Sequence, residues 1–206
     1  MWLEHVFQPR GGPLGEAAAM MASKQEVVAD AERVEGLLAA MAQAIVARKR
    51  RGEFLIVGIR AKGEPLGRRL AAKLAALTGS EVPVGVMDIT LYRDDLSEIA
   101  HNPVLKGTDL PTSVDHRRVI LVDDVLFTGR TVRAAMDQIV DFGRPASIEL
   151  AVLVDRGGRE LPIAPDYVGL RQDVPDDRLV DVRLTEAGDA RDEVLLVKRP
   201  PRPAGH

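Results

Sequence analysis

The sequence has 206 residues, 46% of them hydrophobic, which is enough apolar material for one globular domain with its own core. The formal net charge of −3 gives no overall attraction to nucleic acid or to an anionic membrane. Because the chain contains no cysteine, disulfide frameworks, thiolate metal sites and cysteine nucleophiles are excluded. No apolar run is long enough to span a membrane and the first residues lack a secretory-signal pattern, so we expect a cytoplasmic protein.

Both ends of the chain lack a regular pattern. Glycine and proline without a sustained period predict that residues 1–20 are an irregular N-terminal extension. The proline-rich end, residues 198–206, is predicted to be a disordered tail. Between them, the first strong pattern is a helix predicted over Ala29 to Arg51, followed by Gly52. Its apolar residues recur near the helical period, at Val34, Leu37, Leu38, Met41, Ile45 and Val46.

The predicted helix ends in the basic run Arg48, Lys49, Arg50 and Arg51. Cations at a helix C-terminus are favourable and commonly lie on a solvated face. We prefer this interpretation, and keep a nucleic-acid patch as the alternative.

Strands and helices then alternate. Phe54 to Ile59 is wholly apolar, which predicts a strand buried on both faces, as in a parallel sheet. A turn, Arg60-Ala61-Lys62-Gly63, leads into a helix predicted over Glu64 to Thr78. Strand material follows at Val82 to Val86 and at Asp88 to Leu91.

The second half repeats this alternation. An apolar strand at Val119 to Val122 precedes a helix from about Arg130 to Phe142, and a third apolar run covers Ile148 to Val154. Such alternation predicts an α/β domain with a mostly parallel sheet and covering helices. Ligands of these folds bind beyond the carboxyl ends of the strands, where we expect Arg60, Asp123 and Asp155.

The stretch Val119 to Thr131, VILVDDVLFTGRT, is the strongest candidate binding element. Thr128, Gly129 and Thr131 can offer a phosphate hydroxyls, close backbone N–H groups and the positive end of a helix dipole. In the simpler alternative, Thr128 only caps the helix and the acids form a solvated turn. However, two carboxylates at the end of a buried strand are costly unless they bind something, such as ribose hydroxyls or hydrated Mg²⁺.

This stretch resembles the phosphoribosyl diphosphate signature of type I phosphoribosyltransferases. Further segments resemble the PyrR family in particular, namely Asp88 to Leu96, Arg133 to Asp141, Gly143 to Pro145 and Leu150 to Gly157. PyrR proteins are bifunctional pyrimidine-operon attenuation proteins with uracil phosphoribosyltransferase activity. The resemblance implies the type I phosphoribosyltransferase fold over residues 21–197, with helices on both faces of a central, mostly parallel sheet and a small hood.

The resemblance also implies a site. Asp123 and Asp124 would hold the ribose hydroxyls and the surroundings of Mg²⁺, which arrives with phosphoribosyl diphosphate. The ribose-phosphate element would comprise Asp123, Asp124, Val125, Leu126, Phe127, Thr128, Gly129, Arg130 and Thr131. Pyrophosphate would be bound by Arg60, Ala61, Lys62, Gly63 and the mobile-loop residue Arg93, which with Asp123 and Asp124 forms the catalytic set. The base would meet Tyr167, Val168 and Gly169, in a segment, Ala164 to Gly169, expected to form the hood.

Departures from the family pattern concern the RNA-facing surface. Aligned back from the first strand, the positions of a family Thr-Arg-x-x-His set are Leu38, Ala39 and Ala42, which cannot donate to phosphates or base edges. Gly158 replaces a family histidine, and Leu170 replaces a lysine. We therefore predict weak binding of pyrimidine leader RNA, with Arg48 to Arg51 as its remaining candidate contacts.

The leading hypothesis is thus a Mg²⁺-dependent enzyme that joins uracil to phosphoribosyl diphosphate, giving UMP. The alternatives are a UMP-sensing RNA-binding regulator with little turnover and a divergent nucleotide-binding paralogue. The alignment places Met21 where family members begin, which suggests that the preceding residues are either a dispensable extension or the result of a mis-assigned translation start. We also expect a homo-oligomer, with Leu38 and Met41 as candidate interface residues.

Overall fold

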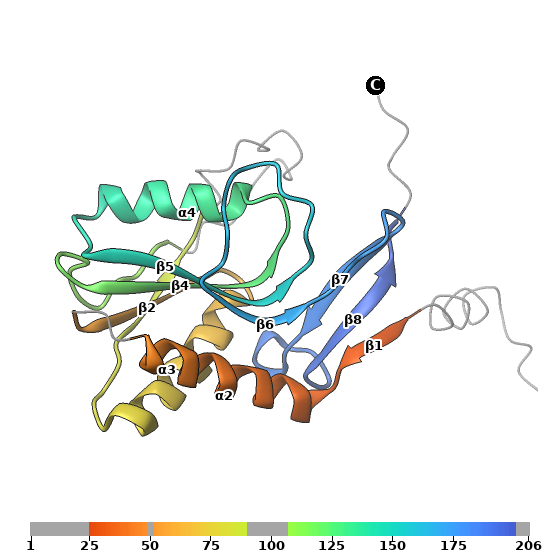
Figure 1. The fold of residues 1–206 in the computed structure, drawn as a ribbon, viewed down its shortest axis with the longest axis horizontal. Helices are drawn as coiled ribbons and strands as arrows, with labels where there is room; N and C mark the ends of the chain where they lie inside the picture. The colour runs from red at the N-terminus through yellow and green to blue at the C-terminus, as the bar shows by residue number, and fades with distance from the viewer. Residues whose placement is uncertain (1–24, 49–51, 90–106, 201–206) are drawn as a thin grey trace, which may run out of the picture.

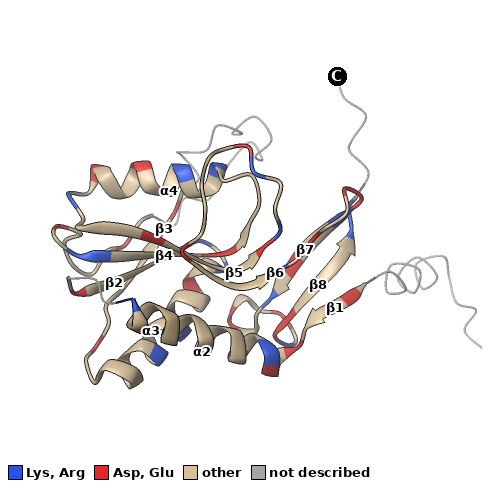
Figure 2. Cartoon of the chain, viewed as in Figure 1, with Lys and Arg blue, Asp and Glu red and all other residues tan. Residues whose placement is uncertain are grey.

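The computed structural model describes residues 25–48, 52–89 and 107–200. Its centre is a five-stranded sheet in the order β3-β2-β4-β5-β6, and every neighbouring pair is parallel. The strands are β2 (Phe54–Ile59), β3 (Val84–Met87), β4 (Arg118–Leu126), β5 (Ser147–Asp155) and β6 (Tyr167–Arg171). Figure 2 shows long stretches of these strands without charged residues, as expected of a sheet that is covered on both faces.

Helices cover the two faces of the sheet. Figure 1 shows α2 (Ala31–Ala47) and α3 (Gly63–Thr78) on one face and α4 (Arg130–Asp141) on the other. Alternate strand residues accordingly enter two different cores: Ile56 packs in the α2–α3 core, whereas Leu55 packs in the α4 core. The predicted fold class is therefore confirmed.

A second, antiparallel sheet lies beside the central one, and we call it the hood. It contains β1 (Glu26–Ala29), β8 (Glu193–Lys198) and β7 (Arg178–Arg183), in that order, with the short 3-10 helix η3 (Thr185–Ala187) between β7 and β8. Arg69 of α3 forms ion pairs with Glu186 and Asp192 and so ties the hood to the core.

The hood differs from its prediction. The segment expected to form it, Ala164 to Gly169, instead leads into β6, the edge strand of the central sheet. Its residues pair in parallel with β5, from Ala151–Tyr167 onward. The prediction was wrong because β6 is short and only partly buried, so it lacks the apolar run that marks β2 and β4.

Helix α2 also differs in detail. It begins after Asp30, whose side chain accepts from the N–H of Arg33, and it ends at Ala47. Leu38 and Met41, predicted as exposed interface residues, are 1% and 3% exposed and belong to the core. That prediction was wrong because helical periodicity identifies an apolar face but not the element that covers it.

Several predictions fall outside the described residues: the extension 1–20, the start at Met21, Leu91, Arg93, Lys49 to Arg51 and the end of the tail. At the C-terminal boundary, β8 continues through Lys198, and the N–H of Arg199 donates to the carbonyl of Asp177. Among the described helices, none combines the length and apolar character that crossing a membrane would require.

Candidate active site

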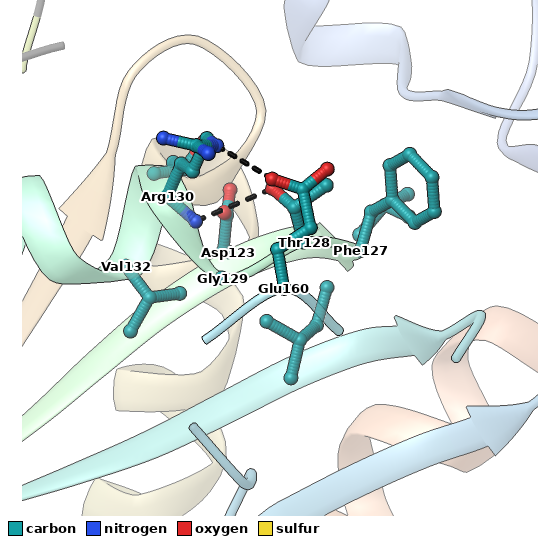
Figure 3. A pocket seen from close by; sticks show the side chains of 10 residues that line it. Asp123, Phe127, Thr128, Gly129, Arg130, Val132 and Glu160 are labelled. Atoms are coloured by element: carbon teal, nitrogen blue, oxygen red, sulfur yellow. Dashed lines mark hydrogen bonds and ion pairs between the residues drawn. The ribbon is translucent and has the colours of Figure 1, made fainter. Parts of the chain in front are cut away.

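A pocket of about 270 Å³ opens at the carboxyl end of β4, where the chain turns into α4 (Figure 3). It is lined by Asp123, Val125, Leu126, Phe127, Thr128, Gly129, Arg130, Thr131, Val132 and Glu160. Apart from Asp124, every residue of the predicted ribose-phosphate element therefore lines one pocket.

The turn from β4 into α4 has the features of an anion site. Gly129 is the N-cap residue of α4 and has a φ of 92°, a left-handed conformation that favours glycine. Gly129 has no side chain to cap the helix, so the first-turn amides lack intrahelical acceptors, and residues 130–132 of that turn line the pocket. The hydroxyl of Thr128 accepts from the N–H of Arg130 at 3.4 Å, and Arg130 Nε donates to Glu160 at 2.7 Å. Gly129, the Thr128 hydroxyl and the positive end of the α4 dipole thus lie together, as a phosphate-binding site requires.

The two acids differ in their surroundings. Asp123 is 6% exposed, and one of its oxygens accepts from the N–H of Asp124 at 3.0 Å. Burial raises the pKa of the Asp124 carboxyl above its ordinary value, an effect opposed by the positive charge of Lys62 and by the N–H of Val125. The pocket therefore holds one carboxylate at its wall and a second, desolvated carboxyl next to it.

The predicted pyrophosphate turn lies beside these acids. Lys62, the N-cap residue of α3, contacts Asp181 of the hood at 3.3 Å and also acts electrostatically on Asp124. Arg60 contacts Glu64 at 3.3 Å, and the peptide bond between Arg60 and Ala61 is cis. Both cations are only partly buried, so a polyanion can compete for them.

Gly63 fixes this turn against β4. A Cβ atom at Gly63 would collide with the carbonyl oxygen of Val122, the residue before Asp123. We expect Gly63→Ala to push the turn away from β4, to cost about 1–3 kcal/mol of unfolding free energy and to weaken phosphoribosyl diphosphate binding. Urea denaturation and calorimetry measure the two effects. Gly36→Ala in α2 is the control, because a Cβ there meets nothing within 4 Å and should stabilise the helix.

Arg159 is a site residue to which the sequence assigned no role. Its guanidinium donates to the carbonyls of Leu126 at 3.3 Å and Phe127 at 2.8 Å, and it pairs with Asp155 at the end of β5. It therefore fixes the backbone of the phosphate turn from the segment that follows the neighbouring strand β5. The only signal in the sequence is the position of Arg159 four residues after that strand's terminal acid.

The Tyr167 side chain lies away from the pocket. Its hydroxyl contacts Glu149 and accepts from Arg118 Nη2 at 2.8 Å, near the amino ends of β4 and β5. The backbone of Tyr167 pairs with Ala151 in the β5–β6 ladder, four residues before the carboxyl end of β5 at Asp155. Val168 and Gly169 continue β6 toward its carboxyl end at Arg171, where Arg171 pairs with Asp155 at 2.9 Å.

Two of the three helix positions considered for RNA face inward, and the third, Ala39, is half-buried. Leu38 and Ala42 are buried in the core, at 1% and 0% exposure. Arg48, the one residue of the basic run within the described ranges, is bound to Asp166 and lies 5.8 Å from the centroid of the Tyr167 ring.

The described part of the chain contains no group of three or more histidine, cysteine or acidic side chains placed to hold a metal ion. Asp123 in the pocket wall and Asp124 next to it offer hard oxygen donors, which suit a cation that arrives bound to a phosphate ligand. They fit Mg²⁺ as indirect or shared ligands rather than as a protein-only metal site.

Comparisons with known proteins agree with this geometry. The family model for the phosphoribosyl transferase domain matches residues 24–183. Two relatives named "Bifunctional protein PyrR", from Deinococcus deserti and Listeria welshimeri, are 50% and 46% identical over 177 and 179 residues. Each alignment covers 85% of this chain, and 96% and 98% of the respective relative.

Solved structures show the same fold at lower identity. A hypoxanthine phosphoribosyltransferase from Staphylococcus aureus has a TM-score of 0.63 at 19% identity, covering 87% of this chain and 96% of that one. The corresponding enzyme from Trypanosoma cruzi, in a ternary complex, gives 0.65 at 19% identity, covering 84% and 95%. With a phosphate turn, paired acids and a basic turn on a type I phosphoribosyltransferase fold, the chain belongs to the phosphoribosyltransferases and, among them, to the PyrR family.

Proposed function

We propose that the chain is a uracil phosphoribosyltransferase that forms UMP and pyrophosphate from uracil and phosphoribosyl diphosphate. The observation that carries the proposal is the pocket between Asp123 and α4, in which an uncapped helix N-terminus and a carboxylate line the same cavity. A ribose 5-phosphate group needs both, the first for its phosphate and the second for its hydroxyls.

In the proposed reaction, N1 of uracil bonds to C1′ of the ribose and releases its proton to water, while the bond from C1′ to the pyrophosphate oxygen breaks and pyrophosphate leaves with the bonding electrons. Thr128 to Thr131 hold the 5′-phosphate, and Asp123 and Asp124 hold the ribose hydroxyls. Arg60 and Lys62, with Arg93 from outside the described residues, neutralise the charge that grows on pyrophosphate. Mg²⁺ bound with the substrate supplies further neutralisation of that charge. Positioning and electrostatics carry the catalysis, and no covalent nucleophile is needed.

The assay incubates the purified protein with phosphoribosyl diphosphate, Mg²⁺ and one free base at a time, and separates the nucleotides formed. We expect UMP from uracil at a rate well above that of any nucleotide from cytosine, hypoxanthine or guanine. Absence of UMP, or faster use of a purine, would contradict the proposed activity.

We further propose that the protein acts in the regulation of pyrimidine operons, as its family suggests, but with weak binding of leader RNA. The buried apolar residues Leu38 and Ala42 support weak binding, because neither can contact phosphates or bases. Gel shifts on pyrimidine leader RNA at physiological salt test this, and tight binding enhanced by UMP would refute it.

A cytoplasmic location and a homo-oligomeric state belong to the same proposal. Exposed apolar side chains in the described ranges include Met136 and Val140 of α4 and the neighbouring Phe142.

A further inference from the structure

Phe127 is an aromatic residue that lines the pocket described above, and 38% of its surface is exposed. Figure 3 shows its ring on the side of the pocket opposite Arg130. A phosphate and ribose hydroxyls are bound by polar groups, so they give no reason for an exposed aromatic ring at this place. An apolar, planar part of a ligand would give one.

One face of the ring is held by Arg156, the residue after β5. The guanidinium carbon of Arg156 lies 4.1 Å from the ring centroid, and Arg156 is only 9% exposed. Its Nε is buried without a hydrogen-bond partner in the described structure. Burial and the nearby charge of Arg199 lower the pKa of Arg156, the charge of Asp176 partly opposes this effect, and the Phe127 ring adds a cation–π contact to the guanidinium. The structure thus retains a costly cation against Phe127.

One edge of the ring is held by backbone. Gly157 and Gly158 both have left-handed conformations, with φ of 72° and 71°. A Cβ atom at Gly158 would overlap the Phe127 ring, whereas one at Gly157 would meet nothing within 4 Å. Gly158 therefore lets the ring lie directly against the chain, and Arg156 and Gly158 together restrict its orientation.

We propose that Phe127 forms the aromatic wall of the base subsite and contacts the pyrimidine ring of uracil and of UMP, with Arg156 and Gly158 as positioning residues. The inference rests on the proposed function, because it assumes a ribose 5-phosphate held by Asp123 and Thr128. A base attached to C1′ of that ribose lies beside the same pocket, and contact between a base and an aromatic side chain contributes about 1–3 kcal/mol.

Calorimetry with two ligands separates the contribution of the base to binding from that of the ribose 5-phosphate. We expect Phe127→Leu to weaken UMP binding by about tenfold, the effect of losing one base–aromatic contact. Binding of ribose 5-phosphate, which has no base, should change by less than about twofold in the same variant. Phe127→Tyr, which keeps the ring, should restore most of the UMP affinity that Phe127→Leu loses.

A second pair of variants tests the positioning role. Gly158→Ala should weaken UMP binding as Phe127→Leu does, because the new Cβ displaces the ring. Gly157→Ala is the matched control, since it introduces the same backbone strain without touching the ring. Arg156→Gln removes the cation behind the ring and should raise the KM for uracil more than the KM for phosphoribosyl diphosphate.

Equal losses of UMP and ribose 5-phosphate affinity in Phe127→Leu would overturn the inference, because the ring would then only shape the phosphate turn. Unchanged UMP affinity in that variant would overturn it as well. These binding measurements need no turnover. A wild-type protein that binds UMP but forms none would refute the proposed enzyme, while the comparison of Phe127→Leu with wild type would still decide the role of Phe127.

Discussion

The Asp124→Asn variant is expected to lose UMP formation on the order of a hundredfold, the scale on which preorganised polar groups act in active sites. Asn keeps the size of the side chain but lacks the negative charge that the cationic ribose of the transition state and the Mg²⁺–phosphate ligand both require. At the same time, the variant is expected to unfold at a higher temperature than the wild type at neutral pH. The reason is that burial disfavours the charged form of Asp124, which its raised pKa expresses.

The direction of the pH effect follows from that raised pKa. The folded protein holds the Asp124 proton more tightly than the unfolded chain, so protonation of Asp124 stabilises the fold. This stabilising contribution is complete below the ordinary Asp pKa of 3.8 and is lost as the pH rises through the higher folded value. The thermal advantage of Asp124→Asn should therefore be largest above the folded pKa of Asp124 and should disappear in acid. Activity of the wild type should fall as the pH drops through that same pKa.

Asp137→Asn on the surface of α4 is the matched control. Asp137 is exposed and pairs with Arg133 at 3.1 Å, so its replacement should change neither the pH profile nor the thermal midpoint by much. Thermal unfolding from pH 4 to 8, together with initial rates of UMP formation, makes the comparison. An Asp124→Asn variant that is less stable than wild type at neutral pH would contradict this prediction. It would show that neighbouring groups more than offset the cost of burying the Asp124 charge.

The phosphate site could be predicted from sequence because its signals are local. Asp123 to Thr131 are consecutive, and the run of apolar residues before them and the glycine at the helix start place them between a strand and a helix. The residues around the proposed base subsite could not be predicted in the same way. Phe127 meets Arg156 and Gly158 only because β4 and β5 are neighbours in the sheet, and Tyr167 turns toward Glu149 through a contact that no periodicity indicates.

A hood was expected, but the strands that form it were not identified, for a related reason. In β7, the residues from Arg178 to Arg183 mix charged and apolar side chains and are mostly half-buried, so they carry no clear strand pattern. β1 pairs with β8 across most of the chain, with Glu26 opposite Leu196. Such pairings depend on the complete fold, whereas β2, β4 and β5 are marked by their own apolar runs.

The largest effect on stability is expected at the far end of the sheet from the pocket. Glu149 is 0% exposed and forms a bidentate pair with Arg118, at 2.6 Å to Nε and 2.9 Å to Nη2. Arg118 also donates to the carbonyl of Ile45 at 3.2 Å and lies 5.1 Å from the Phe54 ring centroid. The pair thus connects β4 and β5 to the end of α2.

Glu149→Ala is expected to cost about 3–5 kcal/mol of unfolding free energy, because it leaves the Arg118 charge buried without its partner. Urea denaturation measures this loss.

The double variant Arg118→Met with Glu149→Leu distinguishes an unpaired charge from lost packing. Replacing both partners by apolar side chains of similar size removes the charges together, so most of the stability lost in Glu149→Ala should return. Turnover of the double variant, measured well below its unfolding temperature, should stay close to wild type, because the pair lies near the amino ends of β4 and β5 and the pocket lies at the carboxyl end of β4. If the double variant is as unstable as Glu149→Ala, the hydrogen bonds to Ile45 and Tyr167 hold α2 and β6 in place, and the charge itself contributes little.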